Sequence, residues 1–246
     1  MARFVAAVRT VTACTAIAVY VLIVGPPGLA WTFLTGRPNI LYTLGLIGVR
    51  MGLAIVGITV RVEGEAHIIP GAVFACNHIS NVDPPVLYQA LARLFPKVRV
   101  LYKAELRRLP ILVWVWDAAG WIPLERANKE QSWPAVERAA DALREGHAFF
   151  IFPEGTRSPT GAVLPFKKGG FVMAIKAQAP VVPVAIMGSR DAMRKGSALV
   201  WPTTVTLAFL PPVPTVGKTI DDRSQIAAAV RGAMRDRLGE AAERIM

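Results

Sequence analysis

The sequence predicts an α/β protein with a mixed central sheet covered by helices, preceded by a membrane-embedded pair of helices. Two observations predict this fold. Residues 1–60 are strongly apolar and contain no acidic side chain. From about residue 60, short β-rich runs alternate with helical stretches, and these runs are continuously apolar. Continuously apolar strands are buried on both faces, which requires helices on each side of the sheet. We therefore expect a membrane-anchoring segment at 1–60 and a second domain at 61–246.

The N-terminal segment is expected to form two helices. The run Val11–Gly25 is apolar, and Pro26 and Pro27 should end the first helix. A helix over this run would rise about 22 Å, less than the ~30 Å hydrocarbon core of a bilayer. A second apolar stretch, Ile40–Val60, is interrupted by Arg50. These lengths favour a hairpin that does not cross the bilayer fully.

The charge of this segment suggests which side of a membrane it faces. Basic side chains flank its apolar runs: Arg3, Arg9, Arg37 and Arg50. Positive charge beside a membrane segment is typical of the cytoplasmic side. Two alternatives remain open. The segment could be a secretory signal peptide cleaved near Ala30, or a plain anchor with no part in function.

The second domain alternates strands and helices. Strands are expected at Thr59–Val62, Val73–Asn77, Val98–Tyr102, Ala148–Phe152, Val181–Ile186 and Thr204–Leu210. Helices are expected near Pro84–Leu94, Leu109–Ala118, Trp133–Glu145 and Gly169–Gln178. Asp221 or Asp222 should cap a last amphipathic helix that runs to about Leu238.

Composition narrows the function classes. Of the 246 residues, 53% are hydrophobic and 18% are charged. That is too apolar for an ordinary soluble enzyme and too polar for a multi-pass carrier. The net charge of +11 favours anionic lipid surfaces, nucleic acids or phosphorylated substrates as partners. The sequence shows no nucleic-acid recognition motif, so we expect no nucleic-acid partner. Two cysteines and three scattered histidines give no metal-ligand cluster, so we expect no metal and no cofactor.

A histidine and an aspartate form the first candidate site. His78 directly follows a predicted buried strand, and strand ends are where α/β sheets bind ligands. Ser80 and Asn81 favour a turn that would bring Asp83 back to the imidazole. A carboxylate there would fix the tautomer and leave the other ring nitrogen free as a general base. In the alternative, Asp83 only caps the helix that begins at Pro84.

The second candidate site is the segment 152–158, Phe-Pro-Glu-Gly-Thr-Arg-Ser, which follows another predicted strand. Gly155 would let a ligand approach the backbone closely, and Thr156 adds a hydroxyl. Arg157 offers the planar fork of donors that suits phosphate. Arg126, which follows an apolar run, could be a second phosphate ligand. In the alternative, both arginines are ordinary surface residues.

Together these segments resemble a known family. Four blocks stand in a fixed order: N-H-x-x-x-x-D at 77–83, G-x-I-x-x-x-R at 120–126, F-P-E-G-T-R-S at 152–158 and V-P-V-A-I at 182–186. This order is similar to the signature of the PlsC-like 1-acylglycerol-3-phosphate acyltransferase family. The segment Lys103–Leu106 also looks like that family's K-x-E-L stretch. The similarity covers roughly residues 60–215.

The resemblance implies a role for each matching residue. His78 would be the general base on the acceptor hydroxyl, with Asp83 as its partner. The remaining matches would bind substrate: Lys103, Arg126, Glu154, Gly155, Thr156 and Arg157. The family's activity implies that an acyltransferase domain at 61–246 moves a fatty acyl group from acyl-CoA or acyl carrier protein. The acceptor would be lysophosphatidic acid, the product phosphatidic acid, and the site the cytoplasmic face of a membrane.

Three questions stay open at this point. Another lysolipid or glycerol-3-phosphate could be the acceptor, and a catalytically silent lipid-binding protein is the alternative from another class. Cys76, two residues before His78, could offer a covalent route, although its strand position favours a buried core cysteine. Trp114, Trp116 and Trp121 could line an acyl-chain groove, lie at the lipid interface, or belong to an ordinary buried helix.

Overall fold

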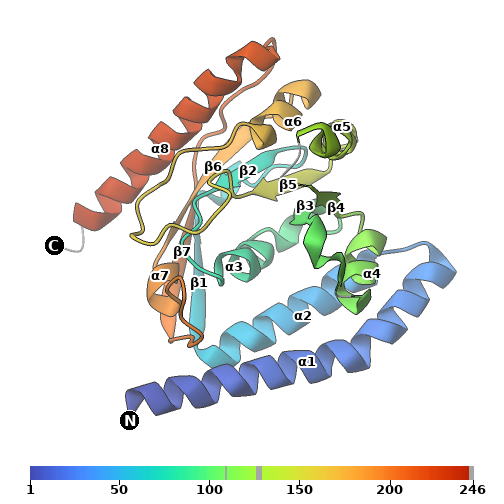
Figure 1. Cartoon of the computed structure of the whole chain (residues 1–246), viewed down its shortest axis with the longest axis vertical. Coiled ribbons are helices and arrows are strands. Elements are labelled where there is room, and N and C mark those ends of the chain that lie inside the picture. Colours follow the sequence, from blue (N-terminus) through green and yellow to red (C-terminus); the bar gives the residue numbers. More distant parts are fainter. Residues whose placement is uncertain (109, 126–128, 244–246) are drawn as a thin grey trace.

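The computed structural model describes residues 1–108, 110–125 and 129–243. Its centre is a sheet with the strand order β1-β7-β6-β2-β5-β3-β4 (Figure 1). The strands are β1 (Ile58–Glu63), β2 (Val73–Cys76), β3 (Val98–Lys103), β4 (Ile122–Leu124), β5 (Ala148–Ile151), β6 (Val181–Met187) and β7 (Thr203–Phe209). Neighbouring strands are parallel, except that β6 and β7 are antiparallel. The predicted mixed sheet is confirmed.

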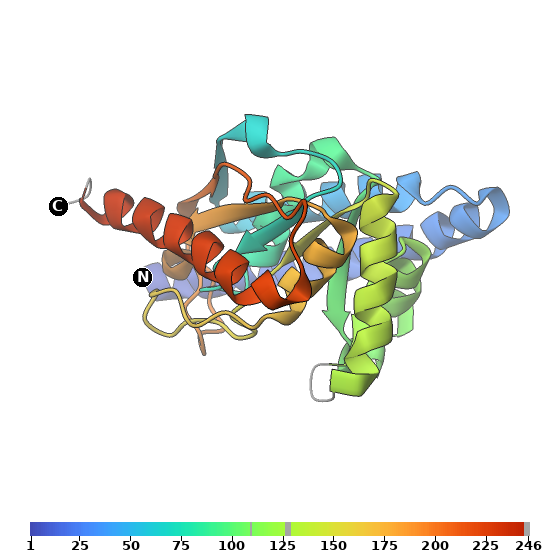
Figure 2. The ribbon, with the colours of Figure 1, turned by 90° about the horizontal axis from the view of Figure 1, so that it is seen from above.

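Helices cover both faces of this sheet, as predicted. They are α1 (Ala2–Thr35), α2 (Asn39–Val56), α3 (Asp83–Ala90), α4 (Pro110–Ala118), α5 (Lys129–Arg144), α6 (Gly169–Ala177), α7 (Ser189–Ala192) and α8 (Arg223–Glu243). Short 3-10 turns are η1 (Glu65–His67), η2 (Ala92–Leu94), η3 (Ala104–Arg108) and η4 (Ile220–Asp222). Figure 1 shows α1, α2 and α3 on one side of the sheet and α5, α6 and α8 on the other. Seen from above, α5 and α8 lie at a steep angle to each other (Figure 2).

The two apolar faces of the sheet come from alternate residues of the same strands. In β2, Phe74 and Cys76 join the core beneath α2 and α3, whereas Val73 and Ala75 join the core beneath α5, α6 and α8. All four residues of β2 are buried. Such a strand has no position for a polar side chain along its length, so polar groups can only follow at its end.

The N-terminal segment forms the expected pair of apolar helices, but the first is longer than predicted. The expectation that Pro26 and Pro27 end it is wrong, because α1 continues for 34 residues, about 51 Å, with both prolines inside. A proline frees the carbonyl four residues before it, here those of Leu22 and Ile23. Both residues are exposed, so groups outside the helix can reach these carbonyls. The helix therefore bends (Figure 1) instead of ending.

Glycines let α1 and α2 pack closely as a hairpin. A Cβ added at Gly52 would lie 2.7 Å from Cδ1 of Ile17, and one added at Gly48 would lie 3.0 Å from Cε1 of Tyr20. The hydroxyl of Tyr20 also donates to the carbonyl of Leu44 at 2.9 Å. Small residues at such contacts are typical of membrane helices. By length and composition, both helices could cross a membrane.

Candidate active site

Two neighbouring strand ends bring the predicted sites together. Strands β2 and β5 are parallel, with Phe74 opposite Phe150, so their carboxyl ends lie at the same edge of the sheet. Asn77, the first residue after β2, is fully buried. Its side-chain oxygen accepts from the N–H of Ile186 at 2.7 Å, and its side-chain nitrogen donates to the Ile186 carbonyl at 3.0 Å. This amide ties the end of β2 to β6 and fixes where His78 leaves the sheet.

The turn after β2 joins His78 to Asp83, as predicted. Nδ1 of His78 lies 2.8 Å from Oδ2 of Asp83. The same oxygen accepts the backbone N–H groups of Ile79 at 2.7 Å and Ser80 at 2.8 Å. Because Oδ2 accepts both backbone bonds, we assign it as the acceptor of the bond with the imidazole too. The ring proton is then on Nδ1, and Nε2 is the free base. The alternative that Asp83 only caps α3 is wrong, because Val82 is the N-cap and the Asp83 side chain binds the imidazole and two backbone N–H groups before the helix.

Burial increases the influence of Asp83 on the imidazole. The residue is 0% exposed, and within the described part of the chain its Oδ1 has no hydrogen-bond partner. The hydrogen bonds of the carboxylate are therefore made through Oδ2, with the imidazole and two backbone N–H groups. A buried carboxylate placed in this way stabilises the imidazolium that forms when Nε2 takes a proton.

The loop after β5 holds the backbone of His78. The His78 N–H donates to Oε1 of Glu154 at 2.9 Å, and the His78 carbonyl accepts from the N–H of Ser158 at 2.7 Å. The ring stacks on Phe152, with centroids 4.2 Å apart and an interplanar angle of 24°. The side chain keeps 18% of its surface exposed. His78 is thus fixed at its nitrogen, its carbonyl and its ring, and it remains accessible.

Glu154 supports His78 from a buried position. It is buried, and its second oxygen, Oε2, accepts the N–H of Leu164 at 3.1 Å. Burial raises the pKa of the Glu154 carboxyl, although its bonds from His78 and Leu164 act in the opposite direction. Since both oxygens bind backbone groups, this residue positions His78. Direct contact between Glu154 and a substrate stays a prediction.

The raised pKa of Glu154 predicts a pH-dependent stability. The folded protein holds this proton more tightly than the unfolded chain does. Its free energy of unfolding should therefore fall as the pH rises from the ordinary carboxyl pKa of 4.5 through the higher folded value. Glu154→Gln removes this titration. Thermal unfolding in detergent, from about pH 4 to about pH 7, should show wild type losing stability relative to the variant. A gap that stays constant across this range would contradict the assignment.

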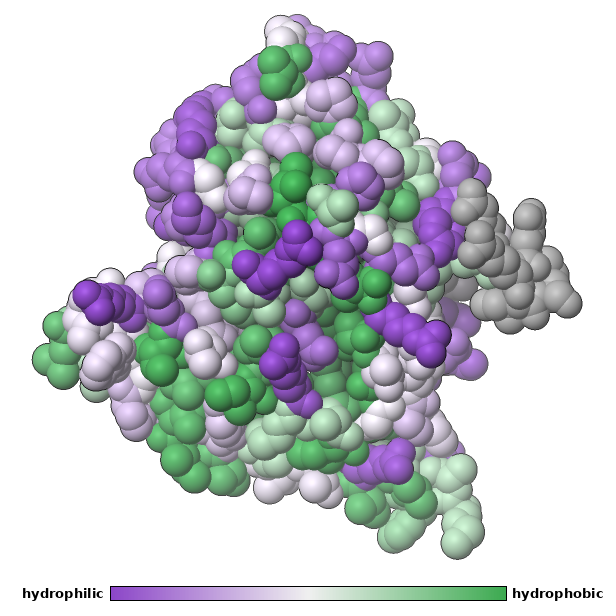
Figure 3. Space-filling view, turned by 180° about the vertical axis from the view of Figure 1, so that it is seen from behind, coloured by the Kyte–Doolittle hydropathy of each residue, from purple (hydrophilic) through white to green (hydrophobic). Residues whose placement is uncertain are grey.

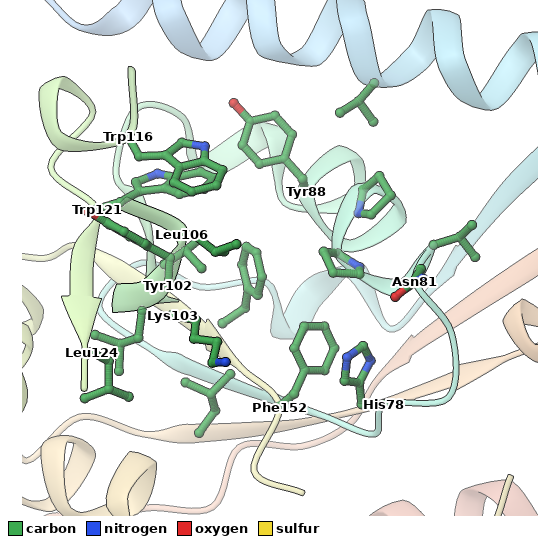
Figure 4. A pocket seen from close by; sticks show the side chains of 18 of the residues that line it. His78, Asn81, Tyr88, Tyr102, Lys103, Leu106, Trp116, Trp121, Leu124 and Phe152 are labelled. Atoms are coloured by element: carbon green, nitrogen blue, oxygen red, sulfur yellow. The ribbon is translucent and has the colours of Figure 1, made fainter. Parts of the chain in front are cut away.

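His78 lies at a groove of about 1940 Å³ between the second domain and the hairpin. Figure 3, which shows the molecule from behind, has many hydrophobic residues over the hairpin and many hydrophilic residues over the rest of the surface. Figure 4 shows Tyr88, Trp116 and Trp121 on the side toward the helices. Trp116 and Trp121 stack at 5.6 Å, and Trp116 contacts Tyr102 at 5.1 Å between ring centroids. These rings form a wall of the groove, whereas Trp114 is 57% exposed and does not line it.

Most of the predicted substrate-binding residues line the same groove: Lys103, Gly155, Thr156 and Arg157. Gly155 has φ +70, and a Cβ there would lie 2.8 Å from Cε of Lys167, which also lines the groove. Nζ of Lys195 donates to the carbonyl of Arg157 at 2.9 Å and so steadies the loop from outside. Arg126, the remaining predicted phosphate ligand, lies outside the described residues.

Three supporting residues escaped the sequence reasoning. Phe152 was assigned to a strand, and its support of the His78 ring had no signal except an aromatic residue before Pro153. Asn77 is adjacent to His78, but its partner Ile186 is 109 positions away. Lys167 lies next to Gly155 only because of the path of the whole loop between them, which local sequence patterns do not indicate.

Cys76 is not placed for a covalent route. Its thiol is fully buried in the strand and points to the Phe74 carbonyl at 3.6 Å. Burial, and then the nearby Asp83 carboxylate, raise the pKa of the Cys76 thiol well above its ordinary value. The thiol therefore stays protonated, and a protonated thiol is a poor nucleophile.

Cys76→Ala is expected to keep its catalytic rate and to lose about 1 kcal/mol of unfolding free energy, through the small cavity it leaves. Initial rates and thermal unfolding of the purified variant measure the two effects. Loss of the rate in a variant that remains folded would restore the covalent route.

Comparisons with known proteins identify relatives of this chain. Residues 59–187 match the protein family described as Acyltransferase. A 1-acyl-sn-glycerol-3-phosphate acyltransferase of Limnanthes douglasii is 31% identical over 194 residues, which cover 78% of this chain and 67% of that protein. The alpha enzyme of that name from Homo sapiens is 32% identical over 188 residues, which cover 72% and 63%. The crystal structure of the LPA acyltransferase PlsC from Thermotoga maritima matches with a TM-score of 0.83 and 26% identity, over 98% of both chains.

Proposed function

Because this chain belongs to the PlsC-like 1-acylglycerol-3-phosphate acyltransferase family, we propose that it forms phosphatidic acid. In this reaction a fatty acyl group passes from acyl-CoA or acyl carrier protein to the free sn-2 hydroxyl of 1-acylglycerol-3-phosphate. The observation that carries the proposal is the hydrogen-bonded pair of His78 and Asp83 at the groove. A protein that only bound lipid would have no use for an oriented base.

The proposed reaction is a direct acyl transfer. Nε2 of His78 takes the proton of the acceptor hydroxyl as its oxygen attacks the thioester carbonyl, and Asp83 stabilises the imidazolium. The tetrahedral intermediate then collapses, the carbon–sulfur bond breaks, and the imidazolium returns the proton to the leaving thiolate. The products are the new ester and a free thiol. No acyl-enzyme, metal or cofactor enters this scheme.

Basic residues support a phosphomonoester as the acceptor's head group. Arg157 and Lys103 line the groove that contains His78. The guanidinium can bind two phosphate oxygens at once, and the ammonium adds a further charge. Gly155 leaves the backbone of the loop open to close approach. We propose that Arg126 belongs to the same site.

The hairpin supports a membrane location. Helices α1 and α2 expose apolar side chains over most of their surface, and the groove runs between them and the catalytic residues. Acyl chains can thus pass between the bilayer and His78 without crossing water. We propose that the catalytic domain lies on the cytoplasmic face, because the flanking charges of residues 1–60 are all basic.

The test of the function is a thiol-release assay on the purified protein in detergent. Lysophosphatidic acid with acyl-CoA, or with acyl carrier protein, should give one free thiol for each phosphatidic acid formed. A panel containing glycerol-3-phosphate, lysophosphatidylglycerol and lysophosphatidic acid identifies the acceptor. If no acceptor supports thiol release from either donor, the protein only binds lipids.

Trp116 predicts a limit on acyl-chain length. Its ring stacks on Trp121 and contacts Tyr102 at a wall of the groove. Trp116→Ala should lengthen the space and favour chains about two methylenes longer. Each buried methylene contributes about 0.8 kcal/mol, so the preference for the longer chain should rise on the order of tenfold. Rates with donors and acceptors of graded length measure this shift. Trp114→Ala is the matched control, and an equal shift in both variants would contradict the assignment.

A further inference from the structure

The groove at His78 extends in two directions. The hairpin arm is the part lined by α1, α2 and α3 and closed by Trp116 and Trp121. The helix arm is the part lined by Trp133, Val136, Lys168, Val172, Ile220 and Arg223. These residues come from α5, α6, η4 and the start of α8, and Figure 2 shows the N-terminal end of α8 beside α6 and α5.

Charge divides the two arms. None of the residues that α1 and α2 contribute to the groove is charged. In the described part of the chain, the lining contains five lysines and arginines against one acidic residue, Glu125. Three of these basic residues, Lys103, Arg157 and Lys167, come from β3 and the loop after β5, and we assign them to the acceptor's phosphate. The other two, Lys168 and Arg223, belong to the helix arm.

We propose that the helix arm binds the phosphopantetheine and nucleotide portion of an acyl-CoA donor, while acyl chains occupy the hairpin arm. This inference rests on the proposed function, since direct transfer requires donor and acceptor to meet at His78 at the same time. The size of the groove supports two ligands. Its volume of about 1940 Å³ exceeds the roughly 300–1,000 Å³ of a pocket for one small molecule.

Trp133 fits the adenine of coenzyme A. Its side chain is 45% exposed on α5. Nζ of Lys176 lies 4.8 Å from the centroid of the Trp133 ring and is held by Glu137 at 2.6 Å. An exposed indole offers a stacking surface to a nucleotide base. Beside it, Val136, Val172 and Ile220 provide apolar contacts for the pantetheine chain.

Lys168 and Arg223 fit the phosphates of coenzyme A. Lys168 is exposed, and among the described residues no carboxylate pairs with it. Nη1 of Arg223 donates to the Ile220 carbonyl at 2.7 Å and lies 3.6 Å from Asp221, whose side chain is fully exposed. The pair with Asp221 is weak, so the other N–H groups of the guanidinium can bind a phosphate. Ammonium and guanidinium groups are the ordinary protein ligands of phosphate.

The experiment is isothermal titration calorimetry of the full-length protein in detergent with coenzyme A. Lys168→Gln and Trp133→Leu should each weaken binding of coenzyme A about five- to tenfold, the loss expected for one charge-assisted or stacking contact. Wild type should bind coenzyme A more tightly than pantetheine, and Lys168→Gln should leave pantetheine binding unchanged. The matched controls are Lys97→Gln, at the opposite edge of the sheet before β3, and Trp114→Leu, outside the groove. Both should bind coenzyme A like wild type.

Two outcomes would overturn the helix arm as the donor site. One is coenzyme A binding that is equally tight in Lys168→Gln, Trp133→Leu and wild type, with thermal unfolding showing all three folded. The other is acyl transfer that proceeds from acyl carrier protein and not from acyl-CoA. A different result bears on the proposed function alone: the two variants weaken coenzyme A binding as expected, yet wild type releases no thiol with any acceptor. The two failures are therefore distinguishable.

Discussion

Replacing His78 with alanine is expected to slow acyl transfer on the order of 10²- to 10⁴-fold, the usual contribution of a general base. The acceptor hydroxyl would lose the group that takes its proton, while the groove and its basic residues would stay in place. Initial rates of thiol release from acyl-CoA, with lysophosphatidic acid saturating, measure the effect. Binding of both substrates should change little, because the imidazole acts mainly in the transition state.

Two further variants sharpen this test. Asp83→Asn should cause a loss of similar size, because a neutral amide does not stabilise the imidazolium and its NH2 group, if turned to Nδ1 of His78, would hold the wrong tautomer. His67→Ala is the matched control, since His67 lies in η1 and does not line the groove. Full turnover by His78→Ala would end the proposed mechanism.

Arg157→Ala is expected to lower kcat/KM for lysophosphatidic acid on the order of 100-fold. A hydrogen bond to a charged group contributes about 1.5–3 kcal/mol, and 3 kcal/mol corresponds to a factor of more than 100. Arg157→Lys should recover only part of this loss, because an ammonium cannot form the bidentate pair. Steady-state kinetics on the three proteins provide the comparison.

An acceptor without phosphate distinguishes phosphate binding from general damage to the site. With a monoacylglycerol, wild type should be slow and Arg157→Ala should be no slower than wild type. Arg61→Ala, in β1 at the far edge of the sheet, is the matched control for loss of one positive charge. An equal loss with both acceptors would show that Arg157 supports the loop and not the phosphate.

The sheet was largely predictable because its strands are continuously apolar. The six predicted strands lie within one residue of the observed boundaries. The missed strand, β4, has three residues and contains Pro123, which cannot donate to a neighbour. It lies at the edge of the sheet, where proline is most often found. The predicted length of α1 was wrong because it depends on contacts outside the helix. Proline tends to end a helix, but the path of α1 is also determined by its close packing on Gly48 and Gly52.

The candidate site was predictable where it is local. The turn through Ser80 brings Asp83 to His78 within five residues, and short-range turn chemistry was enough to expect it. The contact of Glu154 with His78 was not predictable, because it depends on β2 and β5 being neighbours in the sheet. That adjacency results from the packing of the whole domain and has no signature in the residues themselves.

The hydrogen bonds between the loop 152–158 and His78 have a consequence for redesign of this protein. The backbone of His78 is hydrogen-bonded to the segment that contains Arg157, so a change in the path of one displaces the other. A loop grafted from another enzyme would have to bring its own carboxylate at position 154 and its own N–H at position 158, or the imidazole would lose its orientation. Attempts to alter acceptor choice should therefore change side chains that face the groove, such as Lys103, and leave the path of this loop intact.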